Sequence, residues 1–71
     1  MKTLRYKTTK GEVFEVFDYK LISQTLYVNS ELRAHNKYNS ITELQEEFNY
    51  IEKQLKDAGS KYELTDLRKN N

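Results

Sequence analysis

Cysteine and proline are absent from this chain of 71 residues, glycine occurs only twice, and no apolar run exceeds three residues. Without cysteine, disulfides, thiolate metal sites and a cysteine nucleophile are excluded. The two glycines, Gly11 and Gly59, lie too far apart to form either common kind of phosphate-binding loop. A membrane-spanning helix needs ~20 apolar residues, so we expect no membrane association. The polar residues after Met1 predict no signal peptide, and the lack of cysteine is typical of the reducing cytoplasm.

An excess of one sign of charge is also lacking. The chain has twelve basic and eleven acidic residues, which give a formal net charge of +1. This balance identifies neither a nucleic-acid binder nor an acidic inhibitor. The first 20 residues are weakly basic, whereas residues 41–58 are weakly acidic. Residue types with AT-rich codons, such as Lys, Asn and Tyr, outnumber those with GC-rich codons. This bias suggests a low-GC bacterium, or a phage or mobile element living in one, and such elements encode many tiny binding proteins.

The short length limits the stability of the fold. A chain of this size forms one domain and buries only about 60% of the surface that it exposes when unfolded. Its core supplies about 3–5 kcal/mol of net stability, and with disulfides excluded both a well-packed monomer and a homodimer remain open. We expect a single domain over residues 1–67 and a frayed tail over residues 68–71.

An N-terminal β-hairpin is predicted over residues 3–17. Polar and apolar residues alternate over 3–8, with Leu4 and Tyr6 on one face and Arg5 and Lys7 on the other. Residues 12–17 are rich in β-formers. Gly11 lies in the short connection, where it can take the left-handed conformation that such loops need.

A helix is predicted from about Ile41 to Ala58. Ser40 and Glu43 form a Ser-x-x-Glu capping box at its start, and Gly59 is a natural stop. Six apolar residues recur at helical spacing and are expected to face inward together: Ile41, Leu44, Phe48, Ile51, Leu55 and Ala58.

Residues 18–36 fit both a helix and a strand. Helical periodicity covers more of the segment, but residues 25–32 alternate and have strand-like propensity. A third strand would also stabilise the hairpin, so we favour a strand over 25–32, and the alternation over 61–67 predicts a closing strand. The expected fold is α+β, a small antiparallel sheet covered by one amphipathic helix in the order β-β-β-α-β, with β-β-α-α as the alternative.

No constellation for catalysis, cofactor binding or metal binding is evident, and we expect no enzyme. His35, the only histidine, lies in a polar stretch that reads as a loop, and one imidazole cannot anchor a two-His metal motif. The neighbouring carboxylates of Glu43, Glu46 and Glu47 could bind a cation or act as an acid/base pair. They lie off the apolar stripe, however, where nothing predicts the burial that tunes a catalytic carboxylate.

The helix nevertheless carries a candidate partner-binding patch. Tyr50 is expected to project outward beside Glu43, Glu46 and Glu47, and tyrosine is enriched at interface cores. The leading hypothesis is a non-enzymatic protein–protein interaction module, an inhibitor or adaptor that occupies a surface of an unidentified protein partner. Charge reversal at Glu43 and Glu46 should then weaken partner capture and leave thermal stability nearly unchanged.

The alternative hypothesis is a small nucleic-acid-binding regulator. Arg5 and Lys7 share a face of the first strand, and Lys10 lies in the hairpin loop. Basic residues on a β-ribbon can follow a phosphate backbone. The net charge of +1 and the acidic helix make this function less favoured than protein binding.

Overall fold

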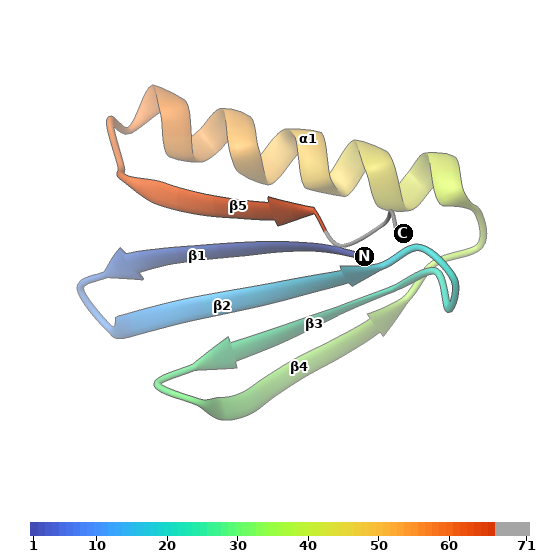
Figure 1. The fold of residues 1–71 in the computed structure, drawn as a ribbon, viewed down its shortest axis with the longest axis horizontal. Helices are drawn as coiled ribbons and strands as arrows, with labels where there is room; N and C mark the ends of the chain where they lie inside the picture. The colour runs from blue at the N-terminus through green and yellow to red at the C-terminus, as the bar shows by residue number, and fades with distance from the viewer. Residues whose placement is uncertain (67–71) are drawn as a thin grey trace.

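The computed structural model describes residues 1–66, which form five β-strands and one α-helix (Figure 1). The elements are, in chain order, β1 (Lys2–Thr8), β2 (Gly11–Asp18), β3 (Ser23–Val28), β4 (Glu31–Lys37), α1 (Ile41–Asp57) and β5 (Tyr62–Asp66). All strands pair antiparallel in one sheet, in the order β4-β3-β2-β1-β5. The predicted α+β fold is confirmed, but four strands precede the helix instead of three. Residue 67 and the predicted tail lie outside the described residues.

The predicted N-terminal hairpin is confirmed. Thr8 pairs with Gly11, so Thr9 and Lys10 make the turn between β1 and β2. Gly11 has φ 132°, and a Cβ there would lie 2.4 Å from Nδ2 of Asn29. Both the backbone conformation and the lack of space therefore require glycine at this turn.

The region over residues 18–36 contains strand and no helix, as favoured, but it contributes two strands where one was predicted over 25–32. Asn29 and Ser30 have φ values of 52° and 69° and turn the chain between β3 and β4. Positive φ at both central residues is the geometry of a type I′ hairpin turn. The side chain of Asn29 also accepts a hydrogen bond from the N–H of Glu12 at 3.1 Å, which fixes this turn to β2.

Helix α1 begins and ends where the capping signals predict. The Ser40 hydroxyl accepts from the N–H of Glu43 at 3.2 Å. At the other end, Gly59 has φ 70°, and the N–H of Ser60 donates to the carbonyl of Leu55 at 2.9 Å. These contacts form a Schellman motif, which satisfies carbonyls that the last turn leaves free.

The core lies between α1 and one face of the sheet. Leu4, Phe17 and Leu44 are completely buried, and the Phe17 and Phe48 rings meet edge to face with centroids 5.2 Å apart. The expectation of six inward-facing residues was wrong at both ends of the helix, because Ile41 is 52% exposed and Ala58 is also exposed.

Candidate interaction surface

The sheet has a second face, turned away from α1, which we call the open face. Strand β2 is apolar on both sides: Val13 and Phe17 are buried on the helix side, while Phe14 and Val16 lie half-buried on the opposite side. Within residues 1–66, all the strands lie in one sheet and the one helix packs on the other face, so no second layer covers the open face (Figure 1). By strand register it carries Thr3, Arg5, Lys7, Glu12, Phe14, Val16, Asp18, Ser23, Thr25, Tyr27, Leu32, His35, Lys37, Glu63 and Thr65.

An aromatic row crosses the centre of the open face, formed by Arg5, Phe14, Tyr27 and Leu32 on four adjacent strands. The Phe14 and Tyr27 rings have centroids 6.1 Å apart and are tilted by 37°. The Arg5 guanidinium carbon lies 4.9 Å from the centroid of Phe14, within the range of a cation–π contact. Leu32 is 61% exposed at the outer end of the row.

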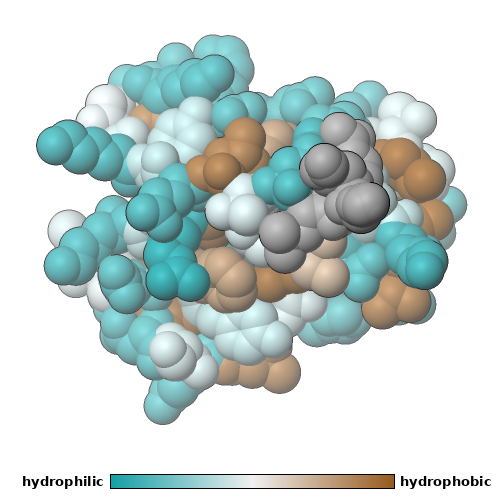
Figure 2. Space-filling view, in the orientation of Figure 1, coloured by the Kyte–Doolittle hydropathy of each residue, from teal (hydrophilic) through white to brown (hydrophobic). Residues whose placement is uncertain are grey.

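Apolar groups gather in the middle of this face. Val16 lies on β2 two residues after Phe14, so four neighbouring side chains form the apolar centre: Phe14, Val16, Tyr27 and Leu32. A shallow depression of about 310 Å³ lies over three of them and is bordered by Arg5 and Glu12. Figure 2 shows hydrophobic residues near the middle of the view, with hydrophilic residues around them.

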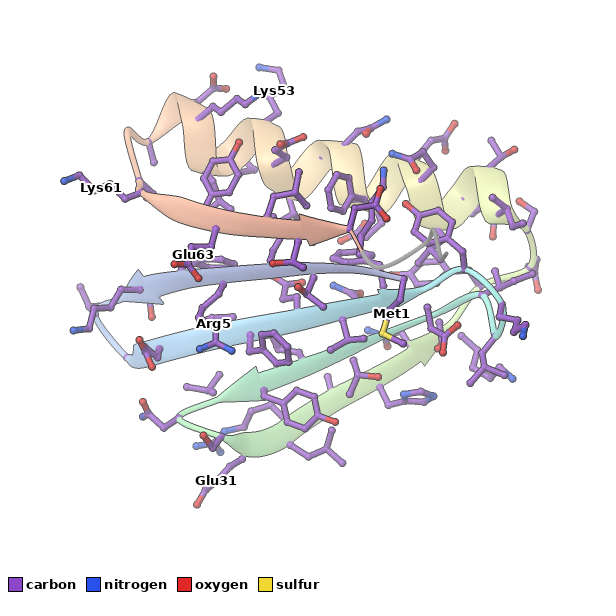
Figure 3. All side chains as sticks on the ribbon, in the orientation of Figure 1. Met1, Arg5, Glu31, Lys53, Lys61 and Glu63 are labelled. Carbon is purple, nitrogen blue, oxygen red and sulfur yellow. The ribbon has the colours of Figure 1, made fainter. Side chains whose placement is uncertain are left out.

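The charges around this centre are balanced. Among residues 1–66, three basic side chains share the face with three acidic ones: Arg5, Lys7 and Lys37 with Glu12, Asp18 and Glu63. Arg5 and Glu63 are direct cross-strand neighbours (Figure 3). An apolar centre containing aromatics and arginine, with a polar rim, is the usual anatomy of a protein–protein interface. A face that follows a phosphate backbone depends instead on a surplus of Lys and Arg.

The open face also contains the only histidine of the chain. His35 was expected in a loop, but it lies on the edge strand β4, and its Nδ1 is 2.9 Å from the hydroxyl oxygen of Thr25 on β3. This contact places an exposed imidazole on the polar rim.

The proposed nucleic-acid-binding residues divide between two places. Arg5 belongs to the aromatic row and Lys7 lies on the same open face, whereas Lys10 lies in the turn at the end of the hairpin. The structure therefore brings two of the three together with aromatic side chains. Tyr6 points to the helix side, so the ring that accompanies Arg5 is Phe14.

The proposed helical patch is less uniform than the sequence indicates. Glu46 and Tyr50 are exposed, with Tyr50 at 59%, but Glu47 is half-buried. The Glu43 carboxylate accepts from the N–H of Asn39 at 3.1 Å and so helps to cap the helix. Charge reversal at Glu43 would remove this cap, so we no longer expect that substitution to leave stability unchanged.

Sequence reasoning missed a buried polar network beneath α1. Glu15 is only 3% exposed; it accepts from the Tyr6 hydroxyl and from Nε2 of Gln24, the latter at 2.6 Å. Tyr38 in turn donates to Oε1 of Gln24 at 2.9 Å. Burial, together with the hydrogen bond to Glu15 and its charge, raises the pKa of Tyr6. The signal in the sequence was a glutamate between Val13 and Phe17, at a position where strand alternation requires an inward-facing residue.

Two further searches concern the described residues alone. No group of three or more His, Asp or Glu side chains that could hold a metal ion occurs among residues 1–66. No helix in this range is long and apolar enough to cross a membrane. Comparison of the chain with protein-family models, curated proteins and solved structures finds no match.

Proposed function

We propose that this chain is a non-enzymatic protein–protein interaction module that binds its partner through the open face of the sheet. The observation that carries this proposal is the contiguous apolar centre formed by Phe14, Val16, Tyr27 and Leu32. Exposed apolar groups that touch one another and have a polar rim are typical of binding sites, whereas isolated ones are ordinary. The module acts by occupying a surface of its partner, as an inhibitor or adaptor.

The sheet supports such a site mechanically. Each strand of the aromatic row is held by backbone pairing to its neighbours, so the row presents its rings in a fixed arrangement. Tyrosine and arginine are enriched among the residues that dominate binding energy, and here Arg5 is held over Phe14. A preorganised surface loses little conformational entropy on binding.

This proposal moves the main contact from the helical patch to the open face. The patch offers Tyr50 as an exposed ring among carboxylates, whereas the open face offers four apolar side chains on three adjacent strands. Glu46 and Tyr50, which lie on the helix, then provide sites for control substitutions away from the open face. The cytoplasmic location and the bacterial or phage origin remain part of the proposal, on the grounds of composition alone.

Partner capture by surface variants tests this function. We would immobilise the wild-type chain, the variant Tyr27→Thr and the variant Tyr50→Ala, and identify by mass spectrometry the proteins that each retains from host lysate. Threonine keeps strand propensity at position 27, and alanine keeps helix propensity at position 50. A protein retained by the wild type and by Tyr50→Ala but lost from Tyr27→Thr supports the open face. Equal retention of every captured protein by the wild type and both variants contradicts it.

Nucleic-acid binding is the competing outcome, because Arg5 and Lys7 share the open face with the rings of Phe14 and Tyr27. Fluorescence anisotropy with single-stranded DNA and RNA at low ionic strength measures it directly. We expect no saturable binding, since the face has no surplus of positive charge. Affinity that falls steeply with added salt and is lost in Arg5→Gln would replace the protein-binding proposal with the regulator hypothesis.

A further inference from the structure

We infer that the open face binds a second copy of this chain, forming a homodimer in which two sheets pack face to face. This inference rests on the proposed function and names the partner. Sheets that pack in this way lie about 10 Å apart with strand directions within about 30° of each other. The dimer is a four-layer sandwich with the two open faces at its centre and a helix on each outer side.

The charges of the face favour an identical partner. A two-fold interface brings the same patch of both copies together, so a patch with a net charge would repel itself. In the part of the chain that the structure describes, the open face has three charges of each sign, and its apolar centre is free of carboxylates and ammonium groups. The same balance gives no preference for a strongly basic or strongly acidic partner.

The size of the face is sufficient for a weak dimer. Five strands spaced about 4.8 Å apart and roughly 20 Å long give a footprint of about 500 Å² on each copy. Two copies together bury about 1,000 Å², near the lower limit for a specific interface. We therefore expect a dissociation constant of about 10–100 μM.

The sheet edges are poorer dimerisation sites than the face. Edge strand β4 is interrupted opposite Leu26 and Tyr27 by a register shift, and its sequence carries charged residues, which oppose pairing with another edge. Edge strand β5 is only five residues long. Strand addition at either edge would also leave the aromatic row uncovered.

Sedimentation equilibrium from about 1 μM to about 1 mM tests the dimer. The average mass should rise from that of one chain to that of two. Tyr27→Thr and Val16→Thr should each raise the dissociation constant at least about tenfold, because every substitution occurs twice in the interface. Tyr27→Thr removes the apolar area of two rings, and Val16→Thr buries two hydroxyls without partners. Tyr50→Ala, on the helix, should leave the constant unchanged. Circular dichroism checks that each variant folds, and Val16→Thr alters the shape of the side chain least.

Three results would overturn the dimer: the mass of one chain up to about 1 mM, a mass beyond two chains, or a dissociation constant that neither face variant changes. These results separate this inference from the proposed function. If the chain stays monomeric and Tyr27→Thr still loses a captured protein, the function stands and its partner is a different protein. If the chain stays monomeric and no capture depends on Tyr27, both proposals fail.

Discussion

Glu15 is an acidic residue in a position that the strand pattern reserves for an apolar one. Removing a carboxylate from water costs several kcal/mol, and the donors of Tyr6 and Gln24 offset that cost by hydrogen bonding. Tyr38 completes the chain of donors through the amide of Gln24. Because each group in this network depends on the next, removing one leaves another buried without a partner.

The first prediction concerns truncation of this carboxylate. Glu15→Ala should lower the free energy of unfolding by about 2–4 kcal/mol, because it leaves a cavity and strips both donors of their acceptor. Glu15→Gln should cost only about 1 kcal/mol, since an amide of the same shape can accept one bond and donate another after the Gln24 amide turns. Urea denaturation measures both, with exposed Glu46→Gln as the control, expected within about 0.5 kcal/mol of wild type. A loss for Glu15→Gln as large as that for Glu15→Ala would contradict the exchange of hydrogen bonds, and a loss below about 0.5 kcal/mol for Glu15→Ala would show that the network contributes little.

The second prediction concerns alkaline pH. The pKa of Tyr6 is raised in the folded chain above the ordinary value near 10. The folded state therefore holds the phenolic proton at pH values where the unfolded state has lost it, so this contribution is complete below pH about 10 and falls as the pH rises further. Tyr6→Phe should be about 1 kcal/mol less stable than wild type at pH 7, because Glu15 loses a donor.

Because phenylalanine does not titrate, the two stability curves should converge above pH about 10. Thermal melts at intervals from pH 7 to pH 12 would measure this, with Tyr50→Phe as the control for loss of an exposed phenol. Parallel curves for wild type and Tyr6→Phe would contradict the raised pKa.

At the scale of elements, the β3–β4 turn stands out because neither of its central residues is glycine. Asn29 and Ser30 both have positive φ. Asparagine tolerates this conformation, but serine has no such preference, and Asn-Gly is the favoured pair for a type I′ turn. The side chain of Asn29 is also bonded to the N–H of Glu12.

The third prediction follows from that turn. Ser30→Gly should raise the free energy of unfolding by about 0.5–1 kcal/mol, because it relieves the left-handed strain at a residue with φ 69°. Asn29→Gly relieves strain too but loses the bond to Glu12, so it should give no gain. The midpoints of urea denaturation compare the two variants. A loss of stability in Ser30→Gly would show that the serine side chain has a stabilising role.

The same turn explains which elements could be predicted. Helix α1 and the first hairpin have local signals: the Ser40 cap, the Gly59 stop and the Gly11 turn. The β3–β4 hairpin has none, since Asn-Ser does not read as a turn. In addition, the register shift puts Leu32 opposite Tyr27 on the open face but Ala34 opposite Leu26 on the helix side. Leu32 and Ala34 are two positions apart and would lie on the same face of a regular strand, but here they lie on opposite faces. The alternation of polar and apolar residues that identifies a strand is therefore lost.

The open face shows the limit of sequence reasoning about the site. The apolar character of β2 on both sides was visible in residues 13–17. The neighbours of Phe14 were not, because its contacts with Arg5 and Tyr27 depend on the order and register of strands. The sequence indicated Arg5 as a candidate nucleic-acid-binding residue because of its charge. Its position over an aromatic ring could be known only from the pairing of β1 with β2.

For the whole molecule, the important feature is that its core is one-sided. One helix covers one face of a five-stranded sheet, and the core cluster centres on Leu4, Phe17 and Leu44. A domain of this length has little net stability to spare. A second copy on the open face would bury Phe14 and Tyr27 and add a second core.

The fourth prediction is that thermal stability depends on protein concentration. Binding that is restricted to the folded state stabilises it by mass action, so the wild-type Tm should rise by several degrees between about 5 μM and about 500 μM. Tyr27→Thr loses the ring contact with Phe14, so its Tm should lie somewhat below the wild-type value at the lowest concentration, where both chains are monomeric, and should show little rise thereafter. Calorimetry across this series distinguishes a loss of dimer formation from a loss of monomer stability, because a defect in the monomer core lowers Tm equally at every concentration. A wild-type Tm that is constant over the series would mean that the open face does not bind its own copy.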